Sequence, residues 1–270
     1  MKLILMGTNE FVVPVFDDLS KKHDIIAVFT RAPKPTGRKH ILTPSPVDVW
    51  AQSRGLKVYT SIRDFDLVNE KPDFIVVISY GAFLGDNVLN FAKCINIHPS
   101  SLPKYRGPSP IKTAILNGDT DMDVCLMEIA PEWDSGDILL RKNILIDEND
   151  TNTDVEHKVS NMAIELLNEY LENPEKYKPV PQIGEIVFTH KFTGADEIID
   201  WKKTPQQIHN QIRALSCGRT KINGIDVKIL ETRIEDGNLQ ITKIQPSGKK
   251  TMDWRSFVNG LRGGEIKYGE

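Results

Sequence analysis

The N-terminal stretch constrains the fold more than any other part of the chain, because it alternates between two kinds of apolar pattern. Residues 3–6 form a short, wholly apolar run that is typical of a buried strand. Apolar residues then recur at the spacing of an amphipathic helix that extends to Lys22: Phe11, Val12, Val15, Phe16 and Leu19. Residues 25–29 are a second apolar run. A strand, a helix and another strand in this order begin a doubly wound parallel sheet, so we predict an α/β fold.

The remaining pattern divides the chain into a front part and a tail. Further strands are predicted at 73–78, 93–95, 124–129 and 138–146, with helices at 46–54, 110–116 and 154–171. Residues 172–181 have the proline-rich, charged composition of a linker. A helix at 205–215 and short strands at 221–222, 227–232 and 239–244 follow, with tight turns that are typical of a small β-barrel. We therefore predict a front domain over 1–172, a linker or crossing segment over 173–203 and a C-terminal domain over 204–270.

The composition indicates a reducing compartment and an uneven distribution of charge between the front part and the tail of the chain. The three cysteines are widely spaced and form no metal-binding or redox pair. The N-terminal apolar run is too short for a signal sequence, and the longest apolar runs are strand-sized, so we expect a soluble, cytoplasmic protein. The net charge is −3, yet residues 186–270 carry 14 Lys and Arg against 10 Asp and Glu. This distribution favours a polyanionic partner for the tail.

The stretch 96–107 carries the strongest indication of a functional site. Asn96 and His98 follow the predicted strand at 93–95 and are two residues apart, so both side chains should point to one face at its carboxyl end. Open α/β sheets bind ligands at that edge, and Tyr80 and Gly81 leave a neighbouring predicted strand at the same edge. The pair alone also fits a surface histidine in front of an irregular, proline-containing loop.

Asp134, in a loop between two predicted strands, is a third polar residue that can join this pair. The chain has no serine or cysteine nucleophile motif and no metal-ligand spacing, so we expect no metal. An imidazole and an amide can donate to a developing oxyanion, and a carboxylate can orient or charge the imidazole. This set fits direct acyl transfer from a carrier to an amine, without a covalent enzyme intermediate. Taken alone, Asp134 also fits a turn residue before Ser135 and Gly136.

A long connection at 30–47 holds four prolines, four basic residues and no acidic residue. The basic residues are Arg31, Lys34, Arg38 and Lys39. Long loops within compact domains are usually functional or disordered, and positive charge on a proline-stiffened loop suits contact with a phosphate backbone. The alternative is a solvated basic loop without a partner.

Four sequence motifs contain these three polar residues or adjoin them: Asn96-x-His98, Ser100-x-Leu102-Pro103, Tyr105-Arg106-Gly107 and Asp134-Ser135-Gly136-Asp137. Together they resemble the 10-formyltetrahydrofolate-dependent formyltransferase family. The segments Pro35-x-Gly37-Arg38, Ile199-Asp200-Trp201 and Gln245-Pro246-Ser247-Gly248 are similar to members that act on tRNA. The likeness covers nearly the whole chain. It implies a Rossmann-like formyltransferase domain followed by a small OB-like β-barrel domain.

The resemblance also implies roles for individual residues. Asn96, His98 and Asp134 would be catalytic. The co-substrate 10-formyltetrahydrofolate would contact a second set of residues: Tyr80, Gly81, Ser100, Ser101, Leu102 and Pro103. The acceptor would be the α-amino group of methionine on initiator tRNA, for translation initiation. The tRNA-binding residues would be Arg31, Lys34, Arg38 and Lys39, which reach the acceptor stem, and the C-terminal domain would bind the tRNA phosphates.

Two other functions remain open from the sequence. One is formylation of a sugar-nucleotide amine, which uses the same chemistry, and the other is a non-catalytic RNA-binding protein of the same fold. The chain departs from the usual family pattern at Pro99, Ser101, Glu132 and Trp133, so we expect the wall of the folate pocket to differ in detail. We expect a monomer.

Overall fold

The computed structural model describes residues 1–37, 39–261 and 265–269. The chain divides into two compact units. The N-terminal unit comprises Met1–Gly107, Asp123–Ile144 and His157–Phe188, and the C-terminal unit comprises Pro108–Met122, Leu145–Glu156 and Thr189–Glu270. Each unit is made of three separate stretches of chain, so the units do not correspond to single continuous domains. The predicted domain boundaries after residues 172 and 203 therefore stay a prediction. Within the described ranges, no helix combines the length and the apolar character that a membrane crossing needs.

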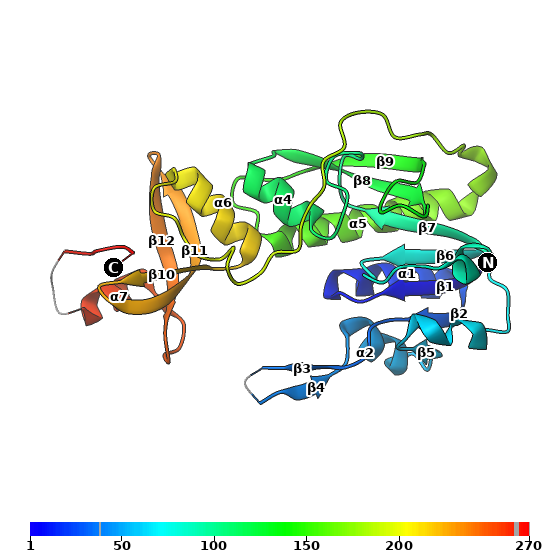
Figure 1. The fold of residues 1–270 in the computed structure, drawn as a ribbon, viewed down its shortest axis with the longest axis horizontal. Coiled ribbons are helices and arrows are strands. Elements are labelled where there is room, and N and C mark those ends of the chain that lie inside the picture. The colour runs from blue at the N-terminus through cyan, green and yellow to red at the C-terminus, as the bar shows by residue number, and fades with distance from the viewer. Residues whose placement is uncertain (38, 262–264, 270) are drawn as a thin grey trace. The chain divides into compact units, whose positions relative to one another are not determined.

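A sheet that has seven strands over the described residues forms the centre of the N-terminal unit (Figure 1). Its order is β5-β2-β1-β6-β7-β8-β9. The strands from β5 to β7 run parallel, and β8 pairs with β7 in the antiparallel sense. The strands are β1 (Lys2–Gly7), β2 (Asp24–Phe29), β5 (Val58–Tyr59), β6 (Phe74–Ile78), β7 (Lys93–His98), β8 (Asp121–Glu128) and β9 (Ile138–Leu145). The predicted α/β class is therefore confirmed.

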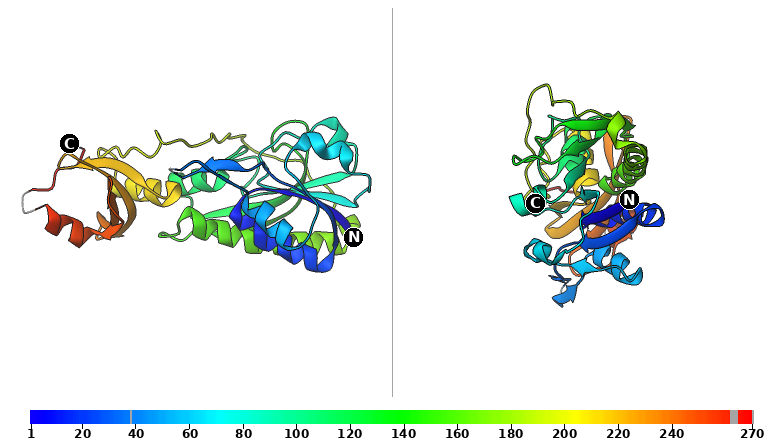
Figure 2. Two further views of the ribbon diagram at one scale, coloured as in Figure 1. Left: turned by 90° about the horizontal axis from the view of Figure 1, so that it is seen from below. Right: turned by 90° about the vertical axis from the view of Figure 1, so that its right-hand side faces the viewer.

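Helices cover both faces of this sheet, which explains why its strands are continuous apolar runs. The helices α1 (Val13–Lys22) and α5 (Asn152–Glu172) lie on one face (Figure 2), where Asn168 Nδ2 donates to Asp18 Oδ2 at 2.8 Å. The opposite face packs against η2 (Ile62–Leu67) and α3 (Asp86–Leu89), whose Phe65 and Val88 share a core cluster with Ile4 of β1. The other helical segments are η1 (Glu10–Val12), α2 (Pro46–Ser53) and η3 (Pro174–Lys176).

Gly7, at the end of β1, allows α1 to approach the sheet closely. A Cβ atom at this position would lie 2.8 Å from Phe16 Cε2 and 2.9 Å from the carbonyl oxygen of Ile78. Phe16 is fully buried, so its ring has no free space into which it could move. The glycine is therefore required by helix–sheet packing.

The strand order of the sheet reverses at β1, which gives a topological switch point between β1 and β6. Because β2 and β6 lie on opposite sides of β1, a crevice is expected at the carboxyl ends of these two strands. The segments that leave β1 and β6 are joined there, since Asn9 Nδ2 donates to Ser79 Oγ at 2.7 Å and Thr8 Oγ1 donates to the Tyr80 carbonyl at 3.4 Å. The fold thus positions Tyr80 at the carboxyl ends of β1 and β6.

The long basic connection contains a β-hairpin that the sequence analysis treated as a loop (Figure 1). Strands β3 (Lys34–Thr36) and β4 (Ile41–Thr43) pair in the antiparallel sense. Pro35 lies within β3 opposite Leu42, which is tolerated because a two-stranded hairpin has only edge strands. The hairpin was missed because its proline and basic residues are depleted in strands.

The C-terminal unit is built around an antiparallel sheet of order β10-β11-β12-β13. Its strands are β10 (Gly218–Ile222), β11 (Ile225–Glu235), β12 (Asn238–Pro246) and β13 (Met252–Asp253), and its helices are α4 (Pro110–Asn117), α6 (Pro205–Leu215) and α7 (Trp254–Gly260). A capping box between Thr204 and Gln207 begins α6, and Ile212 of α6 packs against Ile229 of β11. The predicted small antiparallel β part is confirmed. The elements β13 and α7 were not predicted, because they are too short for periodicity to reveal.

Candidate active site

Strand β7 presents Asn96 and His98 on the face of the sheet that η2 and α3 cover. Cys94 belongs to the core cluster on that face, and alternate residues of a strand share a face. The strand continues beyond its predicted end, since Asn96 pairs with Val77 on β6 and His98 pairs with Cys125 on β8. The Asn96 side chain is half-buried and has no hydrogen-bond partner among the described residues. Its amide is therefore available to a ligand.

The imidazole of His98 is buried, with 5% of its surface exposed, and is fixed through one ring nitrogen. Its Nε2 lies 3.0 Å from the carbonyl oxygen of Tyr105. A carbonyl can only accept, so Nε2 carries a proton and donates it. Tyr105 has a positive φ of 65°, which turns the backbone after the proline-containing loop back towards β7. Nδ1 is thus the ring nitrogen that faces away from this loop.

Asp134 meets His98 from the loop between β8 and β9. Its Oδ1 lies 3.6 Å from Nδ1 of His98, and its Oδ2 accepts a hydrogen bond from the backbone N–H of Gly107 at 2.7 Å. The loop lies against β8 at Gly136, where a Cβ atom would be only 1.9 Å from the carbonyl oxygen of Glu128. The structure therefore brings His98 and Asp134 together and holds Asn96 on the same strand.

Gln182, which no sequence motif singles out, links the two loops that contact His98. Its Oε1 accepts from Arg106 Nε at 3.1 Å and from Arg106 Nη2 at 2.7 Å. Its Nε2 donates to the carbonyl oxygens of Asp134 and Gly136, both at 2.8 Å. Arg106 is 7% exposed, so this amide oxygen supplies an acceptor for two of the donors of a buried guanidinium. The linker-like composition around Gln182 concealed its role.

The arrangement favours hydrogen-bond catalysis over nucleophilic catalysis. An amide and an imidazole on one strand can donate to the same developing oxyanion, and Asp134 is placed to stabilise a charged imidazole. Burial raises the pKa of Cys94 to about 12, so this neighbouring thiol stays protonated and is a poor nucleophile. Among the described residues, no group of three or more His, Cys, Asp and Glu side chains is arranged to hold a metal ion.

Comparison with known proteins places this chain in a family. Residues 1–171 match the family model described as "Formyl transferase", and residues 191–238 match "Formyl transferase, C-terminal domain". The methionyl-tRNA formyltransferase of Rickettsia bellii is 33% identical over 296 aligned positions, which cover 97% of both chains. The chain belongs to the formyl transferase family.

Solved structures of other formyltransferases share the fold. Methionyl-tRNA formyltransferase from Clostridium thermocellum superimposes with a TM-score of 0.67 at 14% identity, over 91% of this chain and 98% of that one. An N-formyltransferase from Helicobacter canadensis, in complex with folinic acid and dTDP-3-aminofucose, gives a TM-score of 0.64 at 22% identity, over 87% and 88%. At these identities the likeness shows the fold alone.

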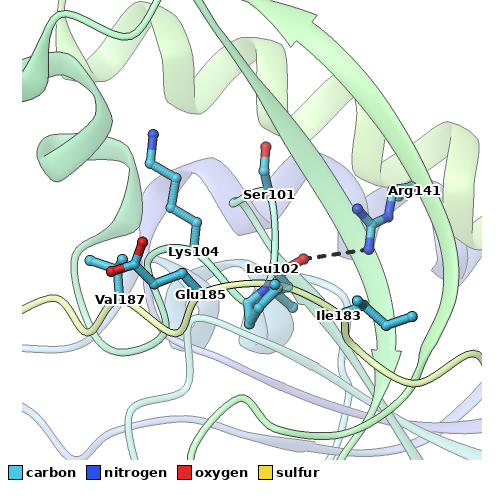
Figure 3. Close-up of a pocket in the computed structure, with 9 residues that line it drawn as sticks. Ser101, Leu102, Lys104, Arg141, Ile183, Glu185 and Val187 are labelled. Atoms are coloured by element: carbon cyan, nitrogen blue, oxygen red, sulfur yellow. Dashed lines mark hydrogen bonds between the residues drawn. The ribbon is translucent and has the colours of Figure 1, made fainter.

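In this formyltransferase, the segment 100–103 is buried except for Ser101, which is half-buried. Ser100 and Leu102 are buried, and Leu102 packs in a cluster with Met127. Three residues of the segment, Ser101, Leu102 and Pro103, line a cavity of about 350 Å³, which Figure 3 shows. Its lining residues are Ser101, Leu102, Pro103, Lys104, Arg141, Ile183, Gly184, Glu185 and Val187. None of the three predicted catalytic residues lines this cavity, so a folate in contact with them would meet the segment elsewhere.

Tyr80 and Gly81 lie in the segment that leaves β6. Burial raises the pKa of Tyr80 to about 12, with a further contribution from Asp64, so the phenol stays protonated. Gly81 has a φ of 73°, which allows this segment to turn. Two exposed aromatic side chains flank the site in sequence: Phe83, 61% exposed, follows Gly81, and Trp133, 58% exposed, precedes Asp134.

Two of the predicted tRNA-binding residues, Lys34 and Lys39, lie on the β3–β4 hairpin of the formyltransferase, and Arg31 precedes it. Lys34 and Lys39 are exposed, and neither forms an ion pair within the part of the chain that the structure describes. Arg31 is half-buried, and its Nη1 donates to the Ala32 carbonyl at 3.2 Å. Arg38 lies outside the described residues.

Proposed function

We propose that this chain transfers the formyl group of 10-formyltetrahydrofolate to the α-amino group of methionine on initiator tRNA, for translation initiation. One observation carries the choice of acceptor: the likeness to the methionyl-tRNA formyltransferase of Rickettsia bellii extends over 97% of both chains. A relative that matched the front domain alone would support formyl transfer and leave the acceptor open.

The folate supplies the formyl carbon, and the tRNA supplies the attacking amine. A bond forms between the amine nitrogen and the formyl carbon, the bond from that carbon to N10 breaks, and the proton lost by the amine passes to N10. An α-amino group has a pKa of about 8, so a useful fraction is already neutral near neutral pH. The enzyme therefore needs oxyanion stabilisation more than it needs a strong base.

Asn96 and His98 supply this stabilisation in our proposal. The unpartnered Asn96 amide donates one hydrogen bond to the oxyanion. The Tyr105 carbonyl already occupies Nε2 of His98 at 3.0 Å, so Nδ1 is the nitrogen that serves the reacting groups. The 3.6 Å separation between Nδ1 and Asp134 Oδ1 exceeds hydrogen-bonding distance, so Asp134 does not occupy Nδ1. The Asp134 carboxylate stabilises the cationic imidazole while negative charge develops.

The exposed rings of Phe83 and Trp133 support a site for the folate beside these residues. A pterin ring is flat and largely apolar on its faces, and aromatic side chains suit it by stacking. We propose that Tyr80, Gly81 and the 100–103 segment complete this site.

The tRNA is bound in two places in our proposal. The exposed amines of Lys34 and Lys39 on the β3–β4 hairpin, with Arg31 and Arg38, contact phosphates of the acceptor stem. The C-terminal domain, residues 204–270, forms an OB-like barrel that contacts the tRNA backbone. We further propose that the enzyme is cytoplasmic and monomeric.

Transfer of labelled formyl from 10-formyltetrahydrofolate to methionine-charged initiator tRNA tests this function. An amino-sugar nucleotide and uncharged tRNA serve as competing acceptors. We expect label on the charged tRNA alone. Label on the amino-sugar nucleotide would overturn the acceptor and keep the chemistry, whereas tRNA binding without any transfer would favour the non-catalytic RNA-binding protein.

A further inference from the structure

The side chain of Gln182 uses every hydrogen bond that an amide can make. It lies in the segment 180–188, which the sequence analysis assigned to a linker. Arginine can only donate and backbone carbonyls can only accept, so the contacts themselves fix which end of the amide is oxygen. Oε1 accepts twice from Arg106, and the two hydrogens of Nε2 go to the carbonyls of Asp134 and Gly136.

These bonds join the two loops that hold His98 from opposite ring nitrogens. Arg106 follows Tyr105, whose carbonyl binds Nε2, and Asp134 faces Nδ1. The same loops are also joined directly, since the Gly107 N–H donates to Asp134 Oδ2. A change in the Gln182 amide therefore acts on Asp134 through its backbone carbonyl, and alters the distance between Asp134 and His98 while both of their side chains stay unchanged.

The segment 180–188 is itself anchored on both sides of Gln182. The backbones of Val180 and Ile138 exchange hydrogen bonds of 2.8 and 2.9 Å at the start of β9. The Arg106 N–H donates to the Val187 carbonyl at 2.9 Å. Gln182 is thus half-buried between two backbone attachments, which restricts where its amide can lie.

We propose that Gln182 is a positioning residue that sets the place of Asp134 relative to His98. The test of this proposal by enzyme kinetics rests on the proposed formyl transfer. It assigns an active-site task to the segment that connects the predicted domains. A misplacement of about 1 Å in a catalytic group typically costs on the order of 100-fold in rate.

The substitution Gln182→Glu tests this proposal. It keeps the acceptors for Arg106 and replaces both donors by a carboxylate oxygen that repels the Asp134 and Gly136 carbonyls. Gln211 offers a matched control, because its Nε2 also donates to two carbonyls, those of Asp196 at 2.7 Å and Ile198 at 2.9 Å. Gln211→Glu likewise removes two hydrogen bonds from an amide to backbone carbonyls, but in the C-terminal unit.

Two readouts separate positioning from loss of stability. With saturating substrates, we expect Gln182→Glu to lower kcat between about 10- and 100-fold while KM for the charged tRNA changes less than about 3-fold. In the NMR spectrum of the folded enzyme, the His98 ring Cε1–H signal should shift in Gln182→Glu and stay in place in Gln211→Glu. Thermal melting of both variants reports the structural cost, and Gln182→Met, which keeps the length and removes all four bonds, provides a second variant.

An unmoved His98 signal in both Gln182 variants would overturn the proposal, as would a kcat within about 2-fold of wild type. The NMR arm needs no substrate. If the wild type failed to formylate charged tRNA, a shifted His98 signal would therefore still support positioning, and only the proposed function would fall.

Discussion

Substitution of Gly136 by alanine perturbs the Asp134 loop at a single point. The new Cβ would lie 1.9 Å from the carbonyl oxygen of Glu128, whereas close carbon–oxygen contacts in proteins are about 3.3 Å, so the loop must move by about 1.4 Å. Asp134 is two residues away and is tied to Gly107 at 2.7 Å. A displacement of about 1 Å is expected to cost on the order of 100-fold in kcat, or about 2.7 kcal/mol of transition-state stabilisation.

Single-turnover formyl transfer measures this loss, with circular dichroism to show that the variant is folded. Gly194→Ala is the matched control, because a Cβ atom there meets no other atom within 4 Å. We expect the control to retain the wild-type rate. A Gly136→Ala enzyme that is folded and as fast as wild type would refute the claim that Asp134 must hold its place.

Three further predictions follow from particular contacts. Lys34→Glu and Lys39→Glu should each weaken tRNA binding, and neutral substitution of either lysine should reduce the salt dependence of log Kd by about 1, in filter-binding assays over a range of salt. Burial lowers the pKa of His209, so the folded state favours its neutral form. As the pH falls below the unfolded value of about 6.5, the unfolded chain takes up the proton first, and the melting temperature of wild type should fall more steeply than that of His209→Gln. Gly7→Ala should destabilise the N-terminal unit by about 1–3 kcal/mol in urea unfolding through overpacking against Phe16, with Gly194→Ala again as the control.

The central sheet was predictable because its strands carry their own signal. Residues 74–78 are all buried, and such a continuous apolar run indicates a strand that is covered on both faces. The helix α6 was predicted at its observed bounds, and the structure adds that a capping box between Thr204 and Gln207 begins it. The β3–β4 hairpin escaped prediction, because backbone pairing stabilises it without an apolar alternation that a sequence could display.

The site was predictable only in part. The proximity of Asn96 and His98 follows from their spacing on a strand. The contact between Asp134 and His98 depends on how a loop folds back, and the resemblance supplied it where spacing did not. The role of Gln182 depends on hydrogen bonds between segments far apart in the sequence, which no local pattern encodes.

The most direct measurement of the central claim compares wild type and His98→Ala in single-turnover formyl transfer to methionine-charged initiator tRNA, with both substrates saturating. The account predicts a rate about 100- to 1,000-fold lower in the variant, as for loss of one oxyanion donor, with the dissociation constant of the charged tRNA unchanged. A variant that transfers formyl at the wild-type rate would contradict the role given to His98.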